Sequence, residues 1–156
     1  MRAQNSVTYN LSSETTGSTL QLPSEGLQLA TDGVGGTYSK GVDYVITISG
    51  SEHPCQDSYT LALSFMNFDI NEADTLFVYD GPSTDYPLLI ASNNMFNALN
   101  GERNVVYASQ NNNTTTNALT VRLKTAIHSG SERGFYCSVG CLKPCEQIMP
   151  HISDTY

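Results

Sequence analysis

Short segments in which apolar and polar residues alternate recur along the chain, and this period of two is the strongest constraint on its fold. In residues 59–65, the apolar side chains of Tyr59, Leu61, Leu63 and Phe65 would all lie on one side of an extended strand. Alternation of this kind is typical of half-buried β-strands, whereas an amphipathic helix repeats every 3.6 residues. The same pattern predicts further strands at 44–48, 76–79, 88–91, 105–109, 119–124 and 135–139, with weaker candidates at 7–11 and 19–22.

Turn-forming residues separate these segments. Gly adopts the left-handed backbone conformation freely, and Asn and Asp tolerate it, so pairs such as Asp32-Gly33 and Asn100-Gly101 mark turns. Only Ser92–Leu99 suggests a helix. Eight or nine short strands at roughly regular spacing predict an all-β fold, an antiparallel two-sheet jelly-roll sandwich.

The charge of the chain limits its partners. The 156 residues carry a formal net charge of −8, and only 14% of them are charged. A nucleic-acid binder needs a basic surface, so no nucleic-acid partner is expected, and a basic protein surface is the more plausible one. No stretch approaches the roughly 20 apolar residues of a membrane helix, so no membrane insertion is expected.

The cysteines indicate the compartment. Cys55, Cys137, Cys141 and Cys145 are even in number and lie in a chain rich in Ser, Thr and Asn, which favours an oxidising environment and two disulfides. We therefore expect a secreted or cell-surface protein, either periplasmic or extracellular.

Three pairings of the four cysteines are open. On one extended strand Cys137 and Cys141 would lie about 13 Å apart, too far to bond. We favour Cys55 with Cys137 and Cys141 with Cys145. A Cys-x3-Cys-x3-Cys metal site is the alternative, but it lacks the Cys-x2-Cys spacing of structural zinc.

One segment is more specific than the rest. Residues 65–81 read Phe65-x-x-Phe68, an acidic connection, Asp74, and an apolar strand that ends in Tyr79-Asp80-Gly81. This segment resembles the central signature of CUB domains. Three further landmarks follow the family order: the early strand 43–48, the run from 99 to 121, and the late Gly134-Phe135. The cysteine pattern departs from that of animal CUB domains and looks more like that of CUB-like domains in secreted bacterial surface proteins.

The resemblance implies a division of the chain. It covers 36–142 as a CUB-like β-sandwich and leaves 1–35 as an N-terminal extension that could add strands to the sandwich. Residues 143–156 contain Pro144 and Pro150 without periodicity and are expected to form a tail or a linker to a following domain. Phe65, Phe68 and Phe135 are expected in the core.

The family also implies a Ca²⁺ site. Its three usual side-chain ligands map onto Asn71, Asp74 and Ala126, of which only Asp74 keeps a carboxylate. Asn71 offers a carbonyl oxygen, and Glu72 or Asp69 could substitute. Ca²⁺ prefers six to eight oxygen ligands with several carboxylates. The competing interpretation is a solvated acidic loop.

The resemblance further implies a recognition module without catalytic activity. We expect a recognition or adhesion module that binds an extracellular protein or a glycan through loops, alongside other domains of the same polypeptide. Loop side chains suited to stacking on a ligand or hydrogen-bonding it are Tyr86, Asn93, Asn94 and Phe96. The alternative function is a carbohydrate-binding module appended to an enzyme in a larger parent protein. Catalysis is not expected, because the sequence lacks a Gly-x-Ser-x-Gly elbow and a His-Glu-x-x-His motif.

Overall fold

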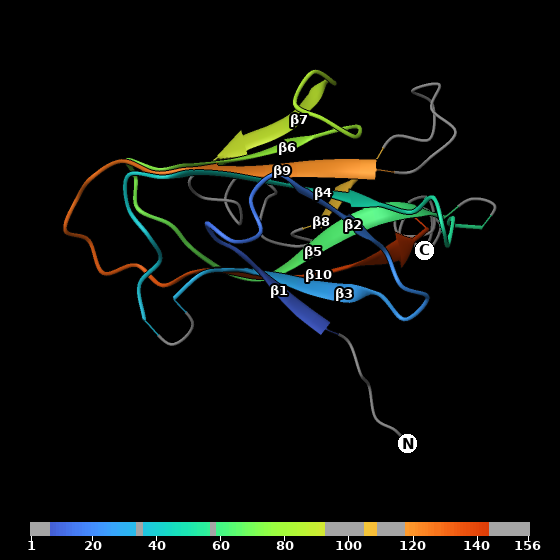
Figure 1. Cartoon of the computed structure of the whole chain (residues 1–156), viewed down its shortest axis with the longest axis horizontal. Helices are drawn as coiled ribbons and strands as arrows, with labels where there is room; N and C mark the ends of the chain where they lie inside the picture. The colour runs from blue at the N-terminus through green and yellow to red at the C-terminus, as the bar shows by residue number, and fades with distance from the viewer. Residues whose placement is uncertain (1–6, 34–35, 57–58, 93–104, 109–117, 144–156) are drawn as a thin grey trace, which may run out of the picture.

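Two five-stranded sheets pack face to face in the computed structural model (Figure 1). The structure describes residues 7–33, 36–56, 59–92, 105–108 and 118–143, and these contain strands and no helix. Sheet A has the order β1 (Val7–Leu11), β3 (Leu27–Thr31), β10 (Gly134–Leu142), β5 (Thr60–Asp69), β8 (Val105–Tyr107). Sheet B has the order β2 (Ser18–Gln21), β4 (Asp43–Ser49), β9 (Ala118–Lys124), β6 (Thr75–Tyr79), β7 (Leu88–Ser92). The predicted all-β sandwich is confirmed.

The two sheets are mixed rather than purely antiparallel. β1 pairs with β3 and β2 pairs with β4 in parallel, while the other pairings are antiparallel. The first four strands alternate between the sheets, so neighbours within a sheet are two strands apart in sequence. The chain runs back through β2, in the opposite sheet, before it enters β3, so β3 runs in the same direction as β1. In the same way β3 returns the chain between β2 and β4, and both pairs are therefore parallel.

The N-terminal part of the chain holds one strand that the sequence analysis missed. β3 has an alternating pattern, and its Leu27 and Leu29 are buried. Strands β1 to β3 lie within residues 7–31 and pair into both sheets. Of the helical suggestion Ser92–Leu99, residues 93–99 lie outside the described residues, and so does most of the C-terminal tail.

The core lies between the sheets and is filled by the inward-facing apolar side chains of both. The largest fully buried members are Tyr38, Leu11, Leu27, Leu29, Ile46, Ile48, Leu61, Leu63, Leu76, Leu119 and Leu123. Alternate residues of β4, β5, β6 and β9 belong to the core or pack against it, as the sequence alternation predicts.

A β-bulge explains the Phe-x-x-Phe spacing. Along the β5–β10 ladder Tyr136 pairs with Asn67 and Cys137 pairs with Phe65, so Met66 is an extra residue in β5. The extra residue brings Phe65 and Phe68 to the same face, although they are three positions apart. Their rings both pack on Phe135, with centroid separations of 5.7 and 6.1 Å. These three phenylalanines are core residues or pack directly on the core, as predicted.

Gly134 opens β10 where a side chain cannot fit. Its φ is +97°, and an added Cβ would lie 1.8 Å from Thr31 Oγ1. A side chain at this position would therefore be strained and would also clash with β3.

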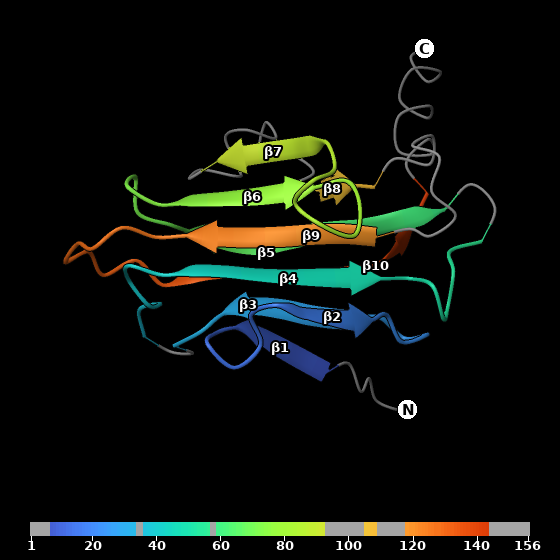
Figure 2. The same cartoon turned by 45° about the horizontal axis from the view of Figure 1, so that its top comes forward.

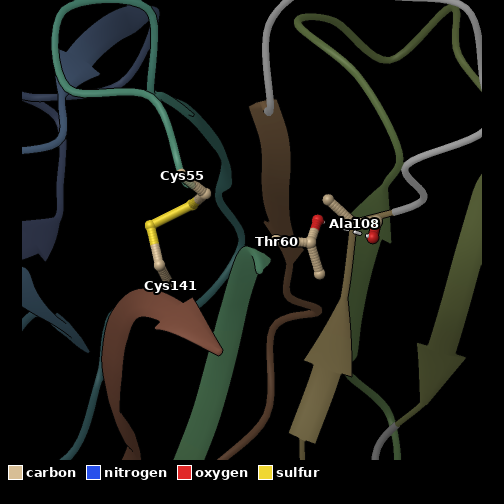
Figure 3. Close-up of a disulfide and its surroundings, with 4 residues drawn as sticks. All are labelled: Cys55, Thr60, Ala108 and Cys141. Atoms are coloured by element: carbon tan, nitrogen blue, oxygen red, sulfur yellow. Dashed lines mark hydrogen bonds between the residues drawn. A yellow bond between two sulfur atoms is a disulfide. The ribbon is translucent and has the colours of Figure 1, made fainter. Parts of the chain in front are cut away.

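A disulfide lies at the end of the sandwich opposite the β9–β10 connection. Figure 3 shows this bond. It joins Cys55, in the β4–β5 connection, to Cys141 in β10, with a Cα–Cα distance of 5.6 Å. Both favoured pairings, Cys55 with Cys137 and Cys141 with Cys145, are wrong, because Cys55 and Cys141 bond to each other. Cys137 faces inward from the middle of β10 and is a free, fully buried thiol. Burial in the apolar core raises the pKa of this thiol, which keeps it protonated. Cys145 lies outside the described residues.

We predict that the Cys55–Cys141 bond contributes strongly to stability. It links residues 86 positions apart, and the chain-entropy treatment of such a loop gives about 4.6 kcal/mol. Replacing both cysteines with Ser is expected to lower the free energy of unfolding in urea by an amount of that order. Mass spectrometry of non-reduced fragments should find Cys55 linked to Cys141, and a Cys55–Cys137 link would contradict the structure.

Candidate functional site

Three connections meet at one end of the sandwich, which we call the loop end. They are the described part of the β3–β4 connection (36–42), the β5–β6 turn (70–74) and the β9–β10 connection (125–133). Figure 2 shows all three converging at the left of the molecule. This end contains the acidic segment that the sequence analysis singled out.

A buried carboxylate joins the three connections. The Asp74 side chain belongs to the β5–β6 turn, is fully buried, and accepts hydrogen bonds from the other two connections. Its Oδ1 accepts from the backbone N–H of Ala126 at 2.8 Å. Its Oδ2 accepts from the Tyr38 hydroxyl at 2.6 Å and lies 2.8 Å from His128 Nε2. Residue 126, which has no ligating side chain, thus contacts Asp74 through its backbone.

The hydrogen bonds of His128 define its tautomer. The backbone N–H of Gly130 donates to His128 Nδ1 at 3.0 Å, so Nδ1 carries no proton. Nε2 therefore carries the proton, and this N–H donates a hydrogen bond to Asp74 Oδ2. Both ring nitrogens are engaged, and neither is left to accept a proton from a substrate. This arrangement orients a loop and gives no support for general base catalysis.

Asn71 extends the network towards solvent. Its backbone N–H donates to the Tyr38 hydroxyl at 2.8 Å, and its side-chain Oδ1 accepts from the Ala73 N–H. Its Nδ2 lies 3.1 and 3.2 Å from the two carboxylate oxygens of Glu132. Asn71 therefore ties the β5–β6 turn to the β9–β10 connection, close to the point where Asp74 does so.

The titration of these groups follows from their contacts. Burial alone would raise the pKa of Asp74, but the bonds from Tyr38, Ala126 and His128 outweigh it, and the pKa lies below its usual value. Burial raises the pKa of the Tyr38 phenol well above its usual value, and Asp74 raises it further. The phenol therefore stays protonated and acts as a donor to the carboxylate.

The structure brings together only some of the predicted calcium ligands. Asp74 and Asn71 share the Tyr38 hydroxyl, while Asp69 accepts the backbone N–H of Arg133 at the end of β5. Glu72 is exposed on the turn. The sequence analysis did not identify Tyr38, His128 or Glu132 as members of this site. They lie 36, 54 and 58 positions from Asp74, and no local pattern connects them to it.

The donor set does not fit Ca²⁺ as it is arranged. Nitrogen atoms of His128 and Asn71 lie against the Asp74 and Glu132 carboxylates, whereas Ca²⁺ takes oxygen ligands. Among the described residues no group of three or more His, Cys, Asp or Glu side chains is placed to hold a metal. The calcium site stays a prediction from the sequence, and nothing below depends on it.

The predicted ligand-binding residues can be placed only in part. Tyr86 is 37% exposed and covers Gly81, where an added Cβ would lie 2.2 Å from the Tyr86 ring. This ring therefore packs on the β6–β7 turn as well as facing solvent. Asn93, Asn94 and Phe96 lie outside the described residues.

The most exposed large apolar side chain among the described residues lies at the loop end. Ile127 is 88% exposed and sits between Ala126 and His128, the two residues that bind Asp74. Its backbone neighbours are thus fixed while its side chain faces solvent. No periodicity in the sequence marks this residue, because it lies in a connection and not in a strand.

We predict that Asp74→Asn destabilises the loop end. The Asn side chain would place an N–H group where the Asp74 carboxylate now accepts hydrogen bonds. A donor would then face another donor, and at least one buried hydrogen bond would be lost. The free energy of unfolding should fall by about 3 kcal/mol in urea denaturation. The exposed Asp85→Asn is the matched control and should change it by less than about 0.5 kcal/mol. Equal effects of the two substitutions would contradict the importance of the network.

We also predict an acid-dependent loss of this stabilisation. Because the pKa of Asp74 is lower in the folded state, its contribution is complete above the unfolded value of about 4 and is lost as the pH falls through the folded value. Urea midpoints measured from pH 7 to pH 3 should show the gap between wild type and Asp74→Asn closing in acid. The pKa of Asp43 is also lowered, but by Arg122, so its contribution is the same in both proteins and cancels in the difference. The Asp74 charge acts on the pKa of Glu132, so the double comparison is repeated in a Glu132→Gln background. A constant gap would refute the prediction.

Comparison with known proteins places the fold. No protein-family model and no curated protein matches the sequence. Among solved structures, the chain is similar to the CUB1-EGF-CUB2 domains of rat MASP-1, with a TM-score of 0.51 and 14% sequence identity. The match covers 80% of this chain and 42% of that one, so this chain spans less than half the length of its structural neighbour. Together with the two-sheet architecture, this likeness shows that the chain has a CUB-like β-sandwich fold.

Proposed function

We propose that the chain is a non-catalytic extracellular recognition module that binds a protein partner through its loop end. The observation that carries this proposal is the exposed Ile127 on a connection fixed on either side by Asp74. A large apolar side chain that is held out to solvent loses little conformational freedom on binding and removes apolar surface from water.

The net charge of the chain favours a partner with basic groups. Glu72 is exposed beside Asn71, and Glu132 is partly exposed on the same connection as Ile127. The chain as a whole carries a net charge of −8. These connections also carry Lys40 and Arg133, and the Ile127 side chain lies beside Gly41, next to Lys40. The preference for a partner that presents Lys or Arg beside an apolar side chain therefore rests on the net charge of the whole chain.

The location of the module is supported by the covalent bond at its opposite end. The Cys55–Cys141 disulfide is of the kind that persists outside the reducing cytosol. No helix among the described residues is long and apolar enough to cross a membrane. A protein-interaction role also agrees with the CUB-like fold. The proposal extends to other domains of the same polypeptide as neighbours of this module.

We predict that Ile127→Asp removes partner binding without unfolding the protein. The substitution takes away the apolar contact and puts a charge in its place. Surface plasmon resonance against an array of purified extracellular proteins should find at least one saturable partner, and Ile127→Asp should weaken its affinity at least tenfold. The attraction to basic groups should also weaken as the salt concentration rises.

Leu88→Asp is the matched control. Leu88 is 50% exposed on β7 and pairs with Tyr79, at the end of β6 away from Asp74. This variant should bind as the wild type does. The proposal fails if no protein in the array binds, or if both variants bind the partner equally well.

A further inference from the structure

A row of four side chains crosses the outer face of sheet A. In register, Asn10 of β1 pairs with Ala30 of β3, Ala30 pairs with Tyr136 of β10, and Tyr136 pairs with Asn67 of β5. Residues directly opposite in a sheet present their side chains on the same face. Their inward-facing neighbours, Leu29 and Cys137 among them, fill the core, so this row faces away from it.

The row contains a depression. Ala30 contributes only a methyl group and is 8% exposed, between the longer Asn10 and Tyr136 side chains. The resulting hollow has a volume of about 560 Å³, which lies within the range of small-ligand sites. It is lined by Thr8, Asn10, Ala30, Thr31, Asp32, Asn67, Arg133, Phe135 and Tyr136.

Several polar groups of the hollow are already held in place. The Nδ2 of Asn10 donates to the Thr31 carbonyl oxygen at 2.9 Å, which fixes its Oδ1 as an acceptor. The Asp32 carboxylate is held by the backbone N–H and the hydroxyl of Ser39, at 2.9 and 2.5 Å. Groups that are oriented before binding lose less entropy when a ligand arrives.

Other polar groups of this face have unused hydrogen-bonding capacity. Arg133 is exposed, and within the described residues its guanidinium makes no hydrogen bond or ion pair. Gln28 lies two residues before Ala30 on the same face of β3, and its buried Oε1 has no partner in the described part of the chain. A buried acceptor without a partner is costly. Gln28 does not line the hollow itself, so only a ligand that extends along β3, or a bound water, would satisfy its Oε1.

We propose that this hollow binds a neutral oligosaccharide. The lining offers donors and acceptors in similar measure, and its two charges, Arg133 and Asp32, are of opposite sign. An anionic ligand would meet the Asp32 carboxylate, and a purely apolar one would leave the amides unpaired. A sugar has hydroxyl groups for Asn10, Asn67 and Arg133, and the apolar face of its ring fits against the Tyr136 ring.

This site is independent of the proposed protein-binding function. It lies on the face of sheet A, is built largely from strand residues, and does not include Ile127. The two proposals therefore fail or succeed separately, and Ile127→Asp should leave saccharide binding unchanged.

The test uses the full chain and defined soluble probes. The protein is produced in a host that does not glycosylate Asn-x-Ser sites, because Asn10 begins such a site. Oligosaccharides of glucose, mannose, galactose and N-acetylglucosamine are titrated by calorimetry, and ¹⁵N NMR shifts locate the site. At least one probe should bind saturably and shift the amides of residues 8–10, 28–32, 67 and 133–136.

Three variants test the lining. Tyr136→Ala should weaken the affinity at least tenfold, and Asn67→Ala and Arg133→Ala several-fold each. The last two side chains are exposed, so they test the site even if Tyr136→Ala does not fold. Tyr86→Ala is the matched control, because Tyr86 is a partly exposed tyrosine in a connection of sheet B. The proposal is overturned if no probe binds, if the shifts lie elsewhere, or if Tyr86→Ala alone abolishes binding.

Discussion

The buried carboxylate of Asp74 determines how the loop end is built. A charge removed from water must be surrounded by donors, and here those donors come from two connections that are distant from Asp74 in the sequence. Tyr38 lies in the β3–β4 connection, and Ala126 and His128 lie in the β9–β10 connection. Because each of these connections supplies part of the hydrogen bonding to the Asp74 carboxylate, neither can move away without leaving a buried polar group unpaired. This requirement turns three irregular segments into one ordered surface, and it explains how Ile127 can face solvent from a fixed backbone.

The two ends of the sandwich are held by different kinds of interaction. The loop end depends on hydrogen bonds whose strength changes with protonation, while the opposite end depends on the covalent Cys55–Cys141 bond. Between them the apolar core includes the Phe65, Phe68 and Phe135 cluster, which a one-residue bulge assembles. Conditions that affect one end, such as acid or a reductant, should therefore leave the other largely intact while the core remains packed.

The sequence predicted those features that depend on local pattern. The alternation of apolar and polar residues in β5 and β9 identified these strands and their buried faces, because successive side chains of a strand point to opposite faces of the sheet. Long-range features were harder. The parallel pairing of β1 with β3 depends on the path of the chain between the sheets, and the partners of Asp74 depend on which connections that path brings together. The cysteine pairing failed for a similar reason: Cys137 has the inward phase of β10, whereas Cys141 reaches the rim where Cys55 lies. The family resemblance mapped residue 126 onto the same site as Asp74, and the two residues are in contact, through the backbone N–H of Ala126.

Because the first four strands alternate between the two sheets, they also determine what covers one edge of each sheet. β1 and β2 are the outermost strands on the same side of the two sheets, and only a short connection separates them in the chain. One continuous segment, residues 7–21, therefore shields the hydrogen-bonding edges of both β3 and β4 at once. Removing this segment would expose the unpaired backbone N–H and C=O groups of both β3 and β4, to which strands of another copy could add. Proteolytic removal of residues 7–21 would therefore make the domain prone to exchange strands with its copies.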